Sequence, residues 1–210
     1  MILLIHGAWH GPWVWRRMLA PGMQTVDLDL SPGASLTSHV NMVLKAIANA
    51  ASPVHLAGHS YGAAVAQIAA ARSDAASLTA LDGFLLRPGQ SIIDLIPPRV
   101  RAEWRAHSMV PPLSAEVMAV NEADRDWVTA QLRPHPLACF TEPAPEIEPY
   151  RGKRLYIRAT GFAFPPFDRI MAQAGKDGWV CETMQTGHDL MLEAPDVLKR
   201  RLETFIRALP

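Results

Sequence analysis

Net charge is the first thing that this chain of 210 residues lacks, because 20 lysines and arginines balance 20 aspartates and glutamates. Proteins that bind nucleic acid or an anionic membrane surface through electrostatics usually carry a basic excess. Long hydrophobic runs are also missing near the start, where the apolar stretch Met1–Ile5 is too short for the core of a signal peptide or for a membrane span. We therefore expect neither nucleic acid nor a membrane as a partner.

Cysteine is scarce too: Cys139 and Cys181 lie in apolar surroundings and show no CxxC spacing. This pattern is typical of buried free thiols in a reducing compartment. The composition, 49% apolar and 19% charged, is that of an ordinary globular protein, and the length suits one domain. We expect a soluble, cytoplasmic protein with a single domain over residues 1–210, and the sequence leaves a homodimer open.

What the chain does contain is an alternation of short apolar runs and longer helical patterns, which predicts an α/β fold with a mostly parallel sheet flanked by helices. Six strands are expected, at Ile2–Ile5, Thr25–Leu30, Val54–Ala57, Leu78–Leu81, Arg154–Ala159 and Val180–Gln185. Helices are expected at Trp13–Ala20, Leu36–Ala51, Tyr61–Ser73, Pro165–Ala174 and Pro195–Leu209.

Residues 88–150, here called the cap segment, have a different character, since they are rich in proline and contain no recognisable strand. Short helical pieces fit between the prolines, at Pro98–Ala106, Ser114–Val120 and Glu122–Leu132. An insertion of this kind between two sheet strands predicts a small helical cap over one edge of the sheet. A peripheral decoration is the alternative.

The stretch Gly58-His59-Ser60-Tyr61-Gly62 joins a predicted strand to an alanine-rich helical pattern. A serine in so sharp a turn needs glycine on both sides, where a Cβ would clash. Such a turn presents the serine oxygen at the carboxyl edge of the sheet, above a helix N-terminus that favours developing negative charge. We predict that Ser60 is a nucleophile. A merely structural glycine turn is the alternative.

A nucleophilic serine needs a base, and His188 is the candidate among eight histidines. It follows the last predicted strand and precedes the last helix, so its loop projects over the same sheet edge as Ser60. The order serine before histidine is that of a hydrolase built on such a sheet. The alternative is an ordinary surface histidine.

An oxyanion hole should accompany this pair, made of two backbone N–H groups. The residue after the nucleophile, Tyr61, would supply one. The loop after the first strand, from His6 to Gly11, would supply the other, with Ala8 as the expected donor. For His6 and His10 we prefer structural hydrogen bonding within this loop to a catalytic role.

At this point the chain resembles an α/β-hydrolase, and in particular the branch of plant methyl-salicylate esterases, hydroxynitrile lyases and bacterial esterases. The resemblance covers nearly the whole chain and rests on HGAWHGPWVW, LAGHSYG, LDGFLLRPGQSIIDLIPP, RPHPLACFTEP and TGHDLMLEAPDVL. Within this branch, the lyases resemble one another in a threonine after the first histidine and a lysine after the catalytic histidine. This chain has Gly7 and Asp189 there. The resemblance therefore implies ester hydrolysis over cyanohydrin cleavage.

The chain departs from the family at the acid of the triad. The resemblance implies a carboxylate in the loop after the penultimate strand, but that loop, Thr160–Pro166, contains none. The nearest carboxylate, Asp168, is expected in the first turn of the next helix, where it suits the helix dipole. Asp82, at the end of another strand on the catalytic edge, is the alternative acid that we prefer. A Ser-His dyad is also left open.

These residues lead to the hypothesis of a serine carboxylesterase for small to medium hydrophobic esters, working through an acyl-enzyme and needing no cofactor or metal. Trp9 and His59 are expected to line the substrate pocket. Trp13 and Trp15 stand close by in sequence, although at least one should pack the first helix. A ligand-binding protein with weak or vestigial turnover is the second hypothesis, motivated by the missing carboxylate.

Overall fold

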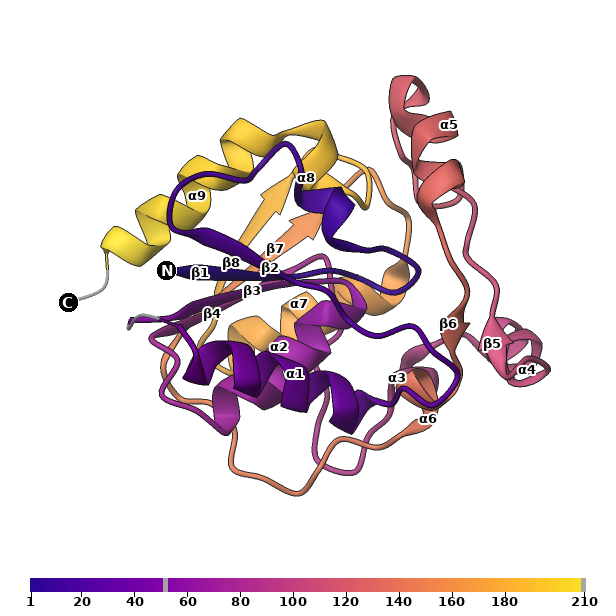
Figure 1. Ribbon diagram of the computed structural model, residues 1–210, viewed down its shortest axis with the longest axis horizontal. Coiled ribbons are helices and arrows are strands. Elements are labelled where there is room, and N and C mark those ends of the chain that lie inside the picture. Colours follow the sequence, from indigo (N-terminus) through magenta and orange to yellow (C-terminus); the bar gives the residue numbers. More distant parts are fainter. Residues whose placement is uncertain (51–52, 209–210) are drawn as a thin grey trace.

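The computed structural model describes residues 1–50 and 53–208, and its centre is one parallel six-stranded sheet (Figure 1). The strands are β1 (Ile2–Ile5), β2 (Met23–Val26), β3 (His55–His59), β4 (Ser77–Leu81), β7 (Lys153–Ala159) and β8 (Val180–Met184). Their order is β2-β1-β3-β4-β7-β8, and every neighbouring pair is parallel. The predicted α/β architecture with six strands is therefore confirmed.

Parallel pairing brings the carboxyl ends of β3, β4, β7 and β8 to one edge. The register pairs Gly58 with Ala80, and Leu81 with Ile157. The strands β1, β3 and β4 are buried along their whole length, as expected for central parallel strands covered on both faces. The loops that leave this edge can bring together residues far apart in the sequence.

Helices cover both faces of the sheet, as Figure 1 shows. They are α1 (Leu36–Ala48), α2 (Tyr61–Ala71) and α7 (Pro165–Lys176) on one face, and the 3-10 helix η1 (Pro12–Trp15), α8 (Leu190–Glu193) and α9 (Pro195–Arg207) on the other. Each face of the sheet packs into its own hydrophobic core, and alternate residues of β1 belong to different cores. Leu3 and Ile5 face α1 and α2, whereas Ile2 and Leu4 face η1 and α9.

Between β4 and β7 the chain forms α3 (Ile92–Leu95), α4 (Pro98–Arg105), α5 (Glu122–Gln131) and α6 (Ala138–Thr141). Figure 1 shows them together at one end of the sheet. The expectation of no strand here was wrong, because β5 (Met109–Val110) and β6 (His135–Pro136) pair antiparallel. Two-residue strands are too short for an alternating pattern to reveal them.

The helix predicted at Ser114–Val120 is a series of turns, in which Ala119 has a φ of 55°. The helix predicted at Trp13–Ala20 is reduced to η1 and following turns, since a segment this short and rich in aromatic residues propagates a helix poorly.

The second strand, Met23–Val26, begins and ends earlier than the predicted range Thr25–Leu30. Two residues after Val26, the Leu28 N–H donates to the His6 ring instead of to a strand. The predicted residues Ala51 and Leu209 lie outside the described residues. Among those described, no helix combines the length and the apolar character that crossing a bilayer requires.

Candidate active site

Ser60 stands at the junction of β3 and α2 in a backbone conformation that few side chains adopt, with φ 53° and ψ −118°. The two neighbouring glycines explain how the turn is possible. A Cβ on Gly58 would lie 2.3 Å from the Gly62 carbonyl oxygen, and one on Gly62 would lie 2.4 Å from the His6 carbonyl oxygen. The tight, strained turn expected for a nucleophile elbow is therefore present.

Asp82 follows β4 directly and is completely buried. His188 Nδ1 lies 2.6 Å from Asp82 Oδ2, and the Ala159 N–H donates to Asp82 Oδ1 at 3.0 Å. Asp82 also has a positive φ, 41°, a backbone conformation that residues other than glycine seldom adopt. Of the two carboxylates weighed from the sequence, Asp82 contacts the histidine.

Asp168 lies in the first turn of α7 with 64% of its side chain exposed, and it accepts from Arg158 Nε at 2.8 Å. Arg158 also donates to Asp82 Oδ1 at 2.7 Å, so one guanidinium joins both candidate acids. Burial lowers the pKa of Arg158, but the carboxylates of Asp82 and Asp168 outweigh this effect and raise it. The arginine is thus charged throughout the working range.

The His188 loop is held from several sides. The His188 N–H donates to the Met118 carbonyl at 3.0 Å, and His59 Nε2 donates to the His188 carbonyl at 2.9 Å. The rings of Phe162 and His59 each lie 4.5 Å from the His188 ring. Among the described residues no hydrogen bond joins the Ser60 hydroxyl to His188, a bond that in such sites often tightens only with substrate.

Gly7 packs directly against the elbow. A Cβ at this position would lie 2.9 Å from Ser60 Cβ and 2.9 Å from His59 Nδ1, so the space admits no side chain without a shift. The following residue, Ala8, is buried beside it. The structure therefore brings the loop of the expected oxyanion donor to the nucleophile, as the sequence predicted.

The oxyanion loop is tied to the histidine loop by a buried pair, His10 and Asp189. His10 Nδ1 donates to the Ala8 carbonyl at 2.7 Å, while Nε2 lies 3.2 Å from both Asp189 oxygens. Both ring nitrogens face acceptors, so both carry protons and His10 is an imidazolium. Burial lowers the pKa of His10, but the Asp189 charge and hydrogen bonds raise it overall. Burial raises the pKa of Asp189, but His10 lowers it well below its usual range.

Five other histidines are held neutral, because burial lowers the pKa of each: His6, His39, His55, His59 and His135. Hydrogen bonds agree for His6, whose Nδ1 donates to the Gly7 carbonyl while Nε2 accepts from Leu28. The structural role expected for His6 and His10 in the loop fits these contacts.

The two residues expected to line a substrate pocket are both buried. Trp9 is 6% exposed, its indole N–H donates to the Val110 carbonyl at 3.1 Å, and its ring packs against Trp104 of the cap segment. His59 is fully buried and supports the His188 backbone, so it is a scaffold residue and not part of an open pocket.

Trp13 and Trp15, which were also considered for the pocket, have packing roles. Trp15 is completely buried in the core under the sheet. Trp13 stacks on His10 and meets Trp127 edge to face. The pocket role considered for them is therefore not supported.

One buried group has the residue types of a metal site: the ligand atoms of His39, His135 and Cys139 lie within 4.8 Å of one another. Ligands of one zinc ion, with bonds of about 2.0–2.3 Å, stand closer together than this. His39 Nδ1 also faces the Tyr61 hydroxyl at 2.8 Å, and Nε2 donates to the Asp29 carbonyl at 2.6 Å. Burial raises the pKa of the Cys139 thiol to about 12. The contacts fit a neutral hydrogen-bond network better than a formed metal centre.

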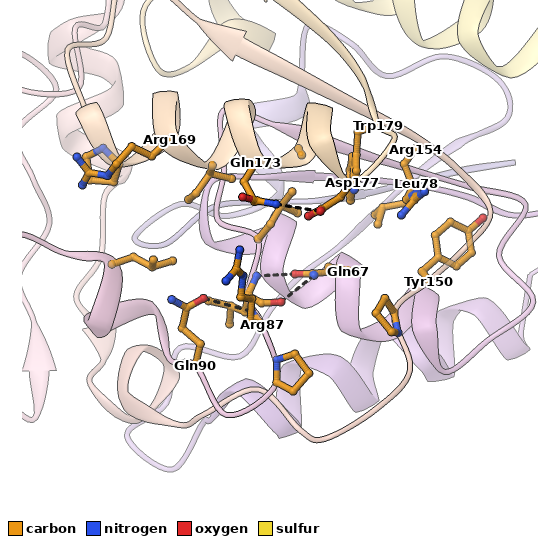
Figure 2. A pocket seen from close by; sticks show the side chains of 18 of the residues that line it. Gln67, Leu78, Arg87, Gln90, Tyr150, Arg154, Arg169, Gln173, Asp177 and Trp179 are labelled. Atoms are coloured by element: carbon orange, nitrogen blue, oxygen red, sulfur yellow. Dashed lines mark hydrogen bonds between the residues drawn. The ribbon is translucent and has the colours of Figure 1, made fainter.

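A groove of about 930 Å³ lies away from this chemistry, between α2, α7 and the start of the cap segment (Figure 2). Arginines and glutamines line much of it, among them Arg87, Arg154, Arg169 and Gln173. None of Ser60, Asp82 and His188 belongs to its lining. Its position argues against a role as the site of ester cleavage.

Two charged contacts of the site were missed from the sequence. Arg158 was counted as a strand residue, although an arginine inside the run Leu155–Ala159 is a signal for a buried ion pair. Asp189 was used only to separate esterases from lyases, and its pairing with His10 joins positions that only the fold brings together.

Residues 2–201 match the model of the alpha/beta hydrolase family, and the chain belongs to this family. A curated relative, a carbendazim hydrolyzing esterase from Nocardioides sp. (strain SG-4G), is 31% identical over 239 residues, covering 95% of this chain and 97% of the relative. The resemblance stated from the sequence is thereby confirmed at the level of the family.

Two solved structures show the same fold. An extracellular α/β-hydrolase from a Paenibacillus species, described as a structural and functional homologue of Tobacco Salicylic Acid Binding Protein 2, superposes with a TM-score of 0.79 at 15% identity, over 97% of both chains. A pyrethroid hydrolase from Sphingobium faniae JZ-2 gives 0.74 at 20% identity, over 99% of this chain and 97% of the other. By relationship this chain is a hydrolase of the esterase kind.

Proposed function

We propose that this protein is a serine carboxylesterase with Ser60 as nucleophile, His188 as base and Asp82 as the orienting acid. The observation that carries the proposal is the 2.6 Å contact between Asp82 Oδ2 and His188 Nδ1, at the same sheet edge as the strained Ser60 turn. This contact supports an acid that follows β4, in a chain whose loop Thr160–Pro166 contains no carboxylate.

The reaction needs only groups of the chain. His188 Nε2 takes the Ser60 hydroxyl proton while the serine oxygen attacks the ester carbonyl, and the backbone N–H groups of Ala8 and Tyr61 stabilise the oxyanion. The proton passes to the departing alcohol. Water then repeats the sequence on the acyl-enzyme, releasing the acid and restoring Ser60. Asp82 stays ionised throughout and fixes the ring.

We further propose that the substrates are small to medium hydrophobic esters. Ser60 and His188 are only 7% and 5% exposed, which favours a compact acyl group over a polymer. Aromatic side chains surround the region, including Phe162 beside His188 and the packed cluster of Trp9, Trp104 and Phe140. The curated relative that is 31% identical is named a carbendazim hydrolyzing esterase, which supports an esterase reaction for this chain.

The test is labelling with a fluorophosphonate probe, followed by a series of para-nitrophenyl esters of increasing acyl length. Wild-type protein should be labelled at Ser60, Ser60→Ala should not, and turnover should peak at a short or medium acyl chain. Failure of wild-type protein to label at high probe concentration would favour the second hypothesis, a ligand-binding protein on a hydrolase scaffold. Labelling that persists in Ser60→Ala would remove Ser60 from its role.

A further inference from the structure

Arg158 is an unusual residue for the inside of a sheet. It is 4% exposed and lies in β7, the strand next to β4, which Asp82 directly follows. Nearly all its donors have partners. Nε donates to Asp168, Nη1 to Asp82 Oδ1 and the Ala159 carbonyl, and Nη2 to the Phe162 carbonyl at 2.8 Å. A buried charge held this completely has a fixed geometry.

The hydrogen bonds divide the Asp82 carboxylate between two tasks. Oδ1 accepts from Arg158 and from the Ala159 N–H, while Oδ2 is left for His188 alone. Because both partners of Oδ1 are obligatory donors here, the carboxylate cannot rotate without losing two hydrogen bonds. Arg158 therefore fixes the oxygen that faces His188.

Arg158 also shapes what lies beside the ring. Its bond to the Phe162 carbonyl holds the loop Thr160–Pro166, in which Phe162 packs against His188 at 4.5 Å. Phe167, from the following helix, stacks near the same ring at 5.8 Å. The loop Thr160–Pro166, which contributes no acid, is therefore held by Arg158 against one side of the His188 ring.

We propose that Arg158 is a positioning residue for the reaction, which makes an acid after β4 effective by fixing Asp82 and by neutralising part of its charge. The inference rests on the proposed function for its meaning in catalysis. Its electrostatic part concerns the pair of Asp82 and His188, whatever the protein does.

The charges around the pair give the sign of the effect. The competent form has an ionised Asp82 and a neutral His188, one negative charge in total, and the Arg158 cation stabilises it. The other titratable groups around the pair are the neutral His59 from β3, the Tyr156 hydroxyl from β7, the Asp189–His10 ion pair and, from α7, the Asp168 carboxylate paired with Arg158. None of them supplies an unpaired positive charge. Removing Arg158 should therefore make the pair hold its proton to higher pH.

The experiment compares Arg158→Met, Arg158→Lys and wild type by two measurements. One is the NMR titration of the His188 ring, assigned with His188→Gln. The other is the pH dependence of fluorophosphonate labelling. In Arg158→Met both midpoints should move to higher pH by about one unit or more, the size expected for a lost charge this close. Arg158→Lys should fall between, since an ammonium keeps the charge without the planar fork.

Arg154→Met is the matched control. Arg154 lies on the same strand and is half-buried, but it faces Trp179 and has no contact with Asp82. Its midpoints should equal those of wild type. Midpoints in Arg158→Met at or below the wild-type value would overturn the inference. If Arg158→Met does not fold, the lysine variant decides, and a midpoint at or below wild type there overturns it as well.

The two measurements keep the failures apart. Labelling that does not depend on Ser60, combined with an NMR midpoint that moves as expected, would refute the esterase and leave the electrostatic role of Arg158 standing. Labelling that depends on Ser60, combined with midpoints that ignore Arg158, would refute the role of Arg158 alone.

Discussion

Replacing Asp82 by asparagine should force the His188 ring into the tautomer that cannot act as a base. The asparagine oxygen must face Arg158 and the Ala159 N–H, since both are donors. Its NH₂ group then points at His188 Nδ1, which can only accept from it. The proton of the ring moves to Nε2, where it blocks removal of the Ser60 proton. The contacts therefore fix the orientation of the new side chain before any measurement.

The size of the loss follows from this reversal. The equivalent change in a serine protease triad costs roughly 10⁴-fold in turnover, equivalent to about 5.4 kcal/mol of barrier. Stability should also drop, by up to about 3–5 kcal/mol, because the buried Arg158 charge would keep the exposed Asp168 as its only carboxylate partner. Rates must therefore be expressed per folded molecule, from labelling and circular dichroism at a temperature below the transition.

Asp168→Asn is the control for the same charge change on the other side of Arg158. Its carboxylate is 64% exposed, so turnover and melting temperature should change little. A turnover in Asp82→Asn within tenfold of wild type, per folded molecule, would refute the assignment of the acid. So would a greater loss in Asp168→Asn.

Three other perturbations have definite outcomes. His188→Ala should lower kcat about as much as Ser60→Ala, and the double variant should be little worse, because members of one relay are non-additive; strictly additive losses would place His188 outside it. Gly7→Thr should abolish probe labelling without unfolding the sheet, as its Cβ would lie 2.9 Å from Ser60 Cβ; wild-type labelling would show that the loop gives way. The melting temperature should fall as pH drops below about 6.5, because five histidines with a lowered pKa in the folded protein are protonated first in the unfolded chain. Each of them lowers the free energy of unfolding by at most about 1.4 kcal/mol per pH unit. Among the histidines discussed, His10 alone has a raised pKa, and it adds stability that is complete below that pH and is lost as pH rises through its folded value. A flat profile of melting temperature against pH would contradict the burial argument.

The sequence is a good guide to the sheet and to the residues that end its strands. Short apolar runs and the glycines around Ser60 reflect local requirements of parallel strands and a tight turn, which periodicity and steric size express directly. The order of chain segments then places Ser60, Asp82 and His188 at one edge. No distance between them follows from that reasoning, so the choice between Asp82 and Asp168 had to stay open.

What the sequence could not give depends on contacts between distant segments. His10 and Asp189 lie at opposite ends of the chain, and no sequence pattern around either residue predicts that they pair. The turns at Ser114–Val120 replace a helix because Met118 and Ala119 are needed against the His188 loop. Tertiary contacts of this kind override local propensity.

All four non-glycine residues with positive φ in the described part of the chain surround the proposed catalytic groups. Ser60 and Asp82 belong to them, Trp9 lies within the oxyanion loop, and the Ala119 carbonyl lies against the Gly187 position, next to His188. Each such conformation costs on the order of 1–3 kcal/mol and persists only while its surroundings hold it. The region therefore stores free energy that the sheet does not. On heating, its residues should relax first, so catalytic power should disappear at a temperature where the parallel sheet is still intact.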